Sequence, residues 1–160
     1  MSVRIDSATS ADADLIGAFV REHWRADFIV TRGRKIFPTT LPALIARESK
    51  ECVGLLSYEV IGKDCEIIAF EALKKHQGIG SALLNEVTGE AKKLGCRRLW
   101  LITTNDNLEA LRFYQRRGFR IRAVHPDAIS LSRKLKPTIP VAGNFGIPIC
   151  DELELEMTLS

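Results

Sequence analysis

The sequence has no long apolar run and few cysteine and histidine residues. None of its hydrophobic stretches approaches the roughly 18 residues that a membrane span needs, and residues 1–6 contain no charged-then-apolar leader. The cysteines lie far apart without a C-x-x-C pair, and the three histidines are equally scattered. We therefore expect free thiols, no metal site, no membrane partner and a reducing cytoplasmic location.

The chain also lacks a strong charge of either sign. Its 23 basic and 20 acidic residues are interleaved and give a net charge of +3, too mild to indicate nucleic acid as a partner. At 160 residues, 46% of them hydrophobic, the chain is large enough to bury a core of its own. We expect residues 1–160 to form a single domain, with no linker or internal repeat.

Hydrophobic periodicity predicts a mixed α/β fold. Strand-like runs occupy seven stretches: 3–5, 43–47, 52–60, 65–73, 98–103, 119–122 and 152–159. Helical spacing of apolar residues occurs near 10–20, 78–94 and 108–117, and residues 126–136 also suit a helix. The prediction is a central twisted mixed sheet of six to seven strands flanked by helices.

Two segments depart from a simple pattern. Residues 25–42 show neither period and are expected to form a loop or a short irregular helix. At the C-terminus, leucine and methionine alternate with Glu152, Glu154 and Glu156, which predicts a strand with one buried face and these glutamates on the other. The long connection 123–151 is irregular after residue 136, and connections of that length often have a function.

A glycine-rich turn at Lys75–Gly80 joins a predicted strand to a predicted helix. The first N–H groups of a helix have no intrahelical acceptor and lie at the positive end of the dipole, and glycine allows a ligand to approach the backbone closely. The turn is therefore a candidate anion site.

Three phosphate ligands can be compared at this turn. A Walker A loop is absent, and the dinucleotide fingerprint would need glycine at the position of Leu83. The remaining interpretation is a cradle for the pyrophosphate of coenzyme A.

Two stretches carry recognisable motifs: Lys75–Gly80 reads K-x-x-G-x-G, and Asn107–Phe119 reads N-x-x-A-x-x-x-Y-x-x-x-G-F. Both resemble motifs of the GNAT superfamily of acyl-CoA-dependent N-acyltransferases, whose turn is commonly Gln/Arg-x-x-Gly-x-Gly/Ala, with lysine here at the first position. Asn107 and Tyr114 are about two helical turns apart, so they lie near one helix face. The resemblance implies acetyl-CoA as cosubstrate, bound by Phe70, Ala72, Lys75, Gln77, Gly78, Ile79, Gly80, Ser81, Asn107, Ala110 and Tyr114.

The resemblance also implies catalytic roles. Tyr114 would protonate the leaving thiolate, and backbone N–H groups near Phe70 and Ala72 would meet the carbonyl oxygen. For the general base Glu71 is preferred, with Glu66, Glu59 or a water relay as alternatives.

The function expected is transfer of acetyl from acetyl-CoA to a primary amine of a small metabolite, by direct attack in a ternary complex. A basic cluster in the irregular segment favours an acceptor that also bears a carboxylate or phosphate: Arg25, Arg32, Arg34 and Lys35. The alternatives are a protein N-terminal or lysine acetyltransferase and a noncatalytic acyl-CoA-binding or sensing module. A homodimer is compatible with each.

Overall fold

The computed structural model describes residues 3–73 and 77–160 and divides the chain into two compact units. The first unit consists of Met1–Ile29, Phe37–Leu99 and Leu159–Ser160. The second consists of Val30–Ile36 and Trp100–Thr158. A short segment near the N-terminus thus belongs with the C-terminal part of the chain.

The first unit is built on four antiparallel strands in the order β1-β4-β5-β6. These are β1 (Arg4–Ser7), β4 (Ala43–Glu48), β5 (Glu51–Ile61) and β6 (Asp64–Ala72). Tight turns join the last three, and Ser49 and Gly62 there have positive φ angles of 58° and 61°. The predicted succession of strands is confirmed.

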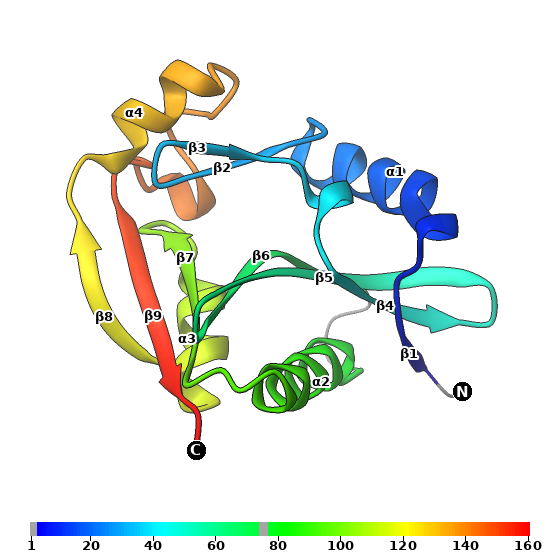
Figure 1. Ribbon diagram of the computed structural model, residues 1–160. Helices are drawn as coiled ribbons and strands as arrows, with labels where there is room; N and C mark the ends of the chain where they lie inside the picture. The colour runs from blue at the N-terminus through cyan, green and yellow to red at the C-terminus, as the bar shows by residue number, and fades with distance from the viewer. Residues whose placement is uncertain (1–2, 74–76) are drawn as a thin grey trace. The chain divides into compact units, whose positions relative to one another are not determined.

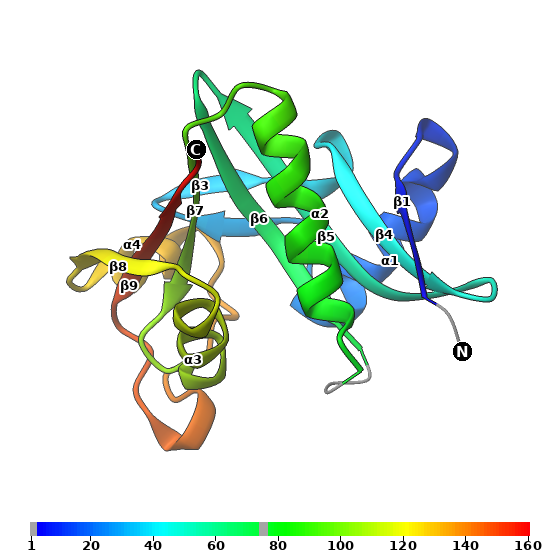
Figure 2. The same cartoon turned by 90° about the horizontal axis from the view of Figure 1, so that it is seen from below.

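Helices α1 (Ala13–Trp24) and α2 (Ile79–Lys93) cover opposite faces of these strands (Figures 1 and 2). The apolar stripe of α1 packs into a core formed by Ile16, Phe19, Val20, Ala43, Ile45 and Leu55. The stripe of α2 is likewise buried, at Ile79, Leu83, Leu84, Val87 and Ala91. Because successive strand residues face opposite sides, one set of strands supports both helices.

The second unit has the strand order β7-β9-β8 and two helices. Its strands are β7 (Arg98–Thr104, the part from Trp100 onward), β9 (Glu152–Thr158) and β8 (Arg120–His125), with β8 antiparallel to β9. Its helices are α3 (Leu108–Arg116) and α4 (Ala128–Leu135). In total, seven strands contribute to a mixed sheet, as predicted. Short 3-10 turns cover Ser10–Asp12, Pro38–Thr40 and Asn144–Gly146.

The prediction of a loop or irregular helix at 25–42 is wrong. This segment contains a separate two-stranded hairpin, β2 (Ile29–Thr31) and β3 (Arg34–Ile36). Its two-residue turn places both Arg32 and Gly33 at positive φ, 51° and 70°, as a type I′ turn requires. Arginine at the first turn position is not a usual hairpin residue, so the composition gave no hairpin signal.

The strand predicted from the period-two pattern at the C-terminus is present as β9, and Leu155 and Leu159 are buried as expected. The burial of Glu152, which is only 2% exposed, was not expected from this pattern. The turn of the β2–β3 hairpin lies at its carboxylate, because the Arg32 N–H donates to both Glu152 oxygens.

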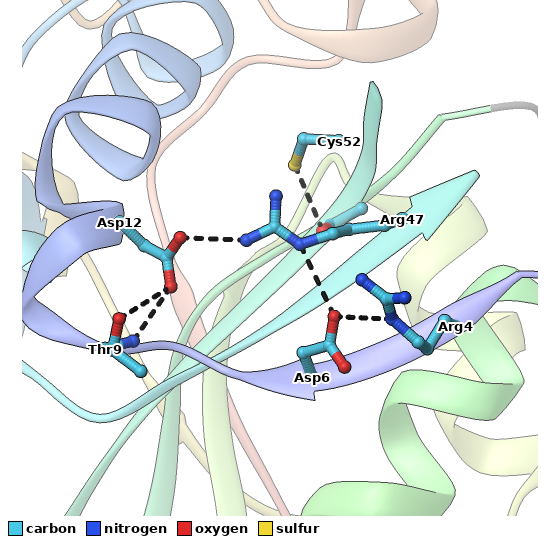
Figure 3. Close-up of polar contacts among 7 residues, drawn as sticks. Arg4, Asp6, Thr9, Asp12, Arg47 and Cys52 are labelled. Carbon is cyan, nitrogen blue, oxygen red and sulfur yellow. Dashed lines mark hydrogen bonds and ion pairs between the residues drawn. The ribbon is translucent and has the colours of Figure 1, made fainter. Parts of the chain in front are cut away.

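A polar network fixes the N-terminal strand and the start of α1 (Figure 3). The Arg47 guanidinium lies 2.8 Å from the Asp12 carboxylate and 3.4 Å from that of Asp6, which also pairs with Arg4 at 2.9 Å. The Thr9 N–H donates to Asp12 at 2.9 Å. These groups come from β1, the turn before α1 and β4, so the network joins three segments of the first unit.

This network predicts a loss of stability in acid. The Thr9 N–H bond and the Arg47 charge lower the pKa of Asp12 in the folded chain. A depressed pKa contributes stability above the unfolded value, about 3.9, and this stability is lost as the pH falls through the folded value. Urea unfolding should show an advantage of wild type over Asp12→Asn at pH 7 that shrinks toward pH 3. Asp14→Asn, at an exposed neighbour, is the control, and a pH-independent difference would contradict the assignment.

Candidate active site

The glycine turn leads directly into α2, as predicted. Gly78 precedes the first helical residue and has φ 77°, a left-handed conformation that glycine adopts without a Cβ penalty. It offers no side chain to cap the helix, and the first turn of α2 contains no acidic residue. The positive end of the helix is therefore not neutralised by its own sequence, which suits an anionic ligand.

Gly54 on β5 allows α2 to pack closely at this end. A Cβ at position 54 would lie 3.0 Å from both the Ile79 Cγ2 and the Leu83 Cδ1 and 3.3 Å from the Ala46 Cβ. The first turn of α2 thus rests directly on a glycine of the strand. This residue was not predicted as part of the site, and its only signal in the sequence is a glycine inside an apolar strand.

Strand β6 is irregular just before the predicted oxyanion position. The register against β5 shifts between Ser57 and Tyr58, so that Ile68 is an extra residue on β6. The buried Ser57 hydroxyl accepts a hydrogen bond from the Ala69 N–H at 3.2 Å. Such a bulge bends the strand, here immediately before Phe70.

The predicted residues of β6 follow this bulge. Phe70, Glu71 and Ala72 pair with Leu56, Leu55 and Gly54, respectively. Glu71 is partly exposed. The alternative base Glu66 is 3% exposed and lies directly opposite Glu59 on β5. Glu71 and Glu59 are both partly exposed, and of the three carboxylates Glu71 is the nearest in the chain to the glycine turn.

Helix α3 carries the second set of predicted residues. The Asn107 Oδ1 accepts from the Ala110 N–H at 3.3 Å and caps the helix, which leaves its Nδ2 for other partners. Tyr114 is 8% exposed, and its ring meets those of Phe113 and Phe119 edge-to-face with centroids 5.3 Å apart in each case. This packing fixes the direction of the Tyr114 side chain.

The end of β7 holds the long connection in place through Asn105. Its Oδ1 accepts from the N–H groups of Cys150 and Asp151, each at 3.0 Å, and its Nδ2 donates to the Pro148 carbonyl at 2.9 Å. These contacts tie the residues before β9 to the residues before α3.

Asp106 makes a second anchor beside Asn105. This carboxylate is 3% exposed and accepts from the Thr104 hydroxyl at 2.6 Å and from the N–H and Nδ2 of Asn144, at 2.9 and 3.0 Å. A Cβ at Gly143 would clash with its Oδ2. Arg133 on α4 adds hydrogen bonds to the carbonyls of Pro140 and Ile149. Asp106 and Arg133 were not predicted as anchors, because no local sequence pattern links either of them to its partners.

Two buried polar residues of the second unit lie on β2 and at the start of β9, Thr31 and Glu152. Glu152 accepts from the Arg32 N–H at 3.3 and 3.5 Å, and the Arg32 guanidinium lies over the Trp100 ring at 4.6 Å. Burial raises the pKa of Glu152, opposed by the Arg32 N–H bond and by the charges of His125 and Arg32. The Thr31 hydroxyl is buried and has no hydrogen-bond partner among the described residues.

The predicted residues fall into two sets. One set belongs to the first unit, on β6 and at the start of α2: Phe70, Glu71, Ala72 and Gln77 through Ser81. The other set belongs to α3 and its N-cap in the second unit: Asn107, Ala110 and Tyr114. Lys75 lies outside the described residues. Within the described part of the chain, no group of three or more histidine, cysteine or acidic side chains could hold a metal ion.

No helix in residues 3–73 and 77–160 is long and apolar enough to cross a membrane.

Comparison with known proteins identifies the family. Residues 14–119, more than half of the chain, match the acetyltransferase (GNAT) family. The chain therefore belongs to this family.

Two Bacillus subtilis proteins, both described as uncharacterized, are similar in sequence. YdhI is 48% identical over 106 residues, which are 66% of each protein, so the chain spans just under two thirds of YdhI. YxbD is 36% identical over 143 residues, 89% of this chain and 90% of YxbD.

Two solved structures have a similar fold. An IAA acetyltransferase from Bacillus cereus has a TM-score of 0.76 at 23% identity and covers 99% of this chain and 100% of its own. A GNAT family acetyltransferase from Elizabethkingia anophelis, solved with acetyl-CoA bound, has a TM-score of 0.69 at 21% identity and covers 98% of both chains.

Proposed function

We propose that this protein transfers an acetyl group from acetyl-CoA to a primary amine of a small metabolite, by direct attack of the amine in a ternary complex. The observation that carries the proposal is the acid-free N-terminus of α2, which follows β6 through the left-handed Gly78 in a member of the GNAT family. A relative in fold solved with acetyl-CoA supports the choice of cosubstrate.

In this proposal both units act together as one acyltransferase domain, residues 1–160. Two solved acetyltransferase structures align with nearly the whole of this chain, which supports a single domain. The backbone N–H groups of Gln77 through Ser81 hold the pyrophosphate. Lys75, which lies outside the described residues, is assigned to the same site from the sequence motif. Asn107, through its Nδ2, together with Ala110 and Tyr114 lines the rest of the coenzyme.

The chemistry needs three protein contributions. Backbone N–H groups at Phe70 and Ala72 stabilise the negative charge that develops on the thioester oxygen. Glu71, partly exposed beside the turn, accepts a proton from the attacking amine. The C–N bond forms as the C–S bond breaks, and the Tyr114 hydroxyl gives its proton to the departing sulfur.

The acceptor in this proposal carries an anionic group as well as an amine. Arg32, Arg34 and Lys35 gather on the β2–β3 hairpin, and Arg25 precedes it. Basic side chains gathered on a short hairpin suit a carboxylate or phosphate. The four cysteines are free thiols, which fits a reducing cytoplasm.

The test is turnover of acetyl-CoA with a panel of amines, followed by release of free thiol. The panel contains 2-aminoethyl phosphate, β-alanine, spermidine and a peptide with a free N-terminus and a lysine. We expect the small anionic amines to be acetylated better than spermidine. Preference for the peptide would indicate a protein acetyltransferase, and coenzyme binding without turnover on any amine would indicate a noncatalytic sensing module.

A further inference from the structure

Strand β8 is the edge strand of the second unit. Among the described residues, β9 lies on one side of β8 and no strand lies on the other. Figure 1 shows this arrangement, with β8 as the yellow arrow outside β9. An edge strand has backbone N–H and C=O groups along its outer side that are not used by the sheet. These groups of β8 can therefore pair with an added strand.

The side chains of β8 are also well exposed. Ile121 and Val124 are 47% and 53% exposed, respectively. Arg120 and Arg122 are exposed as well. An added strand would therefore meet apolar and basic side chains together.

A basic segment, residues 112–122, runs from α3 into β8. Five of its eleven residues are exposed arginines, and none is acidic. Arg112 and Arg116 are four residues apart on α3, which places them on one helix face. Helix α3 and β8 contact each other within the unit. Positive charge is therefore concentrated at this edge of the sheet.

The protein itself does not neutralise most of this charge. Within residues 3–73 and 77–160, four of the arginines form no ion pair: Arg112, Arg116, Arg120 and Arg122. Glu154 on the neighbouring strand lies 3.1 Å from His125 instead. The planar guanidinium group matches the geometry of a carboxylate and can bind it through two hydrogen bonds. The basic segment therefore suits a partner that carries carboxylates.

We propose that β8 and the basic segment 112–122 form a docking surface for an acidic, extended peptide segment of another protein. The segment adds to the edge of β8 as a further strand. In this mode of recognition, backbone hydrogen bonds supply affinity and alternate side chains supply specificity. Here acidic side chains pair with the arginines, and apolar side chains pack against Ile121 and Val124. The inference goes beyond acetyl transfer and does not depend on it.

The same observations disfavour two other occupants. A second copy of this chain would bring a second set of arginines to the edge, and like charges on paired strands are destabilising. A nucleic acid has phosphates for the arginines but no peptide backbone that could extend the sheet. The net charge of +3 is also small for such a partner. An acidic peptide suits both the free edge and the charge.

Binding of a short synthetic peptide to the full chain tests the surface. The probe is a capped peptide in which glutamate alternates with valine, and calorimetric titration measures its Kd. We expect saturable binding that weakens as salt is added. A matched peptide with lysine in place of glutamate should not bind. If the acidic peptide does not bind, the proposal is overturned, and the arginines only protect the edge from association.

Variants locate the binding on the chain. Arg120→Gln combined with Arg122→Gln should raise the Kd by about three- to tenfold. The control is Arg97→Gln, which removes an exposed arginine of the first unit and should leave the Kd unchanged. Equal Kd values for the double variant and the control would contradict the assignment. If the double variant does not fold, Arg112→Gln combined with Arg116→Gln decides by the same measurement.

A modified peptide separates backbone pairing from charge. The same acidic peptide, N-methylated at every residue, keeps its carboxylates but has no backbone donors, and it should not bind. The unmodified peptide should slow amide hydrogen exchange in residues 120–125. Equal binding of the methylated peptide, or tighter binding of polyuridine RNA than of the acidic peptide, would overturn the proposal. These measurements contain neither acetyl-CoA nor amine, so their result is independent of the proposed acetyl transfer.

Discussion

Tyr114→Phe is expected to lower kcat for acetyl transfer by about 10²- to 10⁴-fold, the usual contribution of a positioned general acid. The KM for acetyl-CoA should change little, because the ring keeps its edge-to-face packing against Phe113 and Phe119. Loss of the hydroxyl should cost about 1 kcal/mol of stability or less. The measurement is thiol release at saturating amine.

The chain offers a matched control for this variant. Tyr58 is its other tyrosine, it is similarly buried at 7% exposure, and it lies on β5 outside the predicted site. Tyr58→Phe should retain kcat within about twofold, since it touches no proposed catalytic group. Equal turnover of Tyr114→Phe and Tyr58→Phe would remove Tyr114 as the general acid and leave the thiolate to be protonated by water.

Gly54→Val is expected to lower the free energy of unfolding by about 1–3 kcal/mol, the usual cost of overpacking. The new Cβ alone would lie 3.0 Å from Ile79 and Leu83, and the two methyl groups need further space. The strain moves the first turn of α2 away from the strand. Because that turn is the proposed pyrophosphate site, the Kd for acetyl-CoA should rise as well.

Gly89→Ala, in the middle of α2, is the control with the opposite sign. A Cβ there would meet nothing within 4 Å, so alanine should stabilise the helix by up to about 1 kcal/mol. Urea unfolding and calorimetric titration with acetyl-CoA measure both variants. If Gly54→Val lowered the free energy of unfolding but left the Kd for acetyl-CoA unchanged, the close packing of α2 on β5 would not contribute to cofactor binding.

Local chemistry made the glycine turn predictable. Gly78 and Gly95 mark the two ends of α2 because both have positive φ, 77° and 78°, and the apolar spacing between them has a helical period. Asn107 and Gly118 bracket α3 in the same way, through a side-chain cap and a φ of 98°. The ends of these helices are determined by residues close together in the chain, so they could be predicted from the sequence.

Long-range contacts explain what the sequence did not reveal. Glu152 is buried because the turn at Arg32, 120 residues earlier, lies against it. Asp106 holds the long connection in place because its carboxylate accepts a hydrogen bond from the Asn144 N–H. Position 143 needs glycine because a Cβ there would clash with the same carboxylate. No local pattern encodes these pairings. The catalytic roles of Glu71 and Tyr114 remain predictions for the same reason, since they lie in different units.

The most direct test of the account is transfer of a ¹³C-labelled acetyl group from acetyl-CoA to 2-aminoethyl phosphate or β-alanine, detected as the N-acetylated product by mass spectrometry. Labelled amide should form with the wild-type enzyme and fall sharply with Tyr114→Phe. Coenzyme A release without any labelled amide, or no reaction in the presence of tightly bound acetyl-CoA, would contradict it.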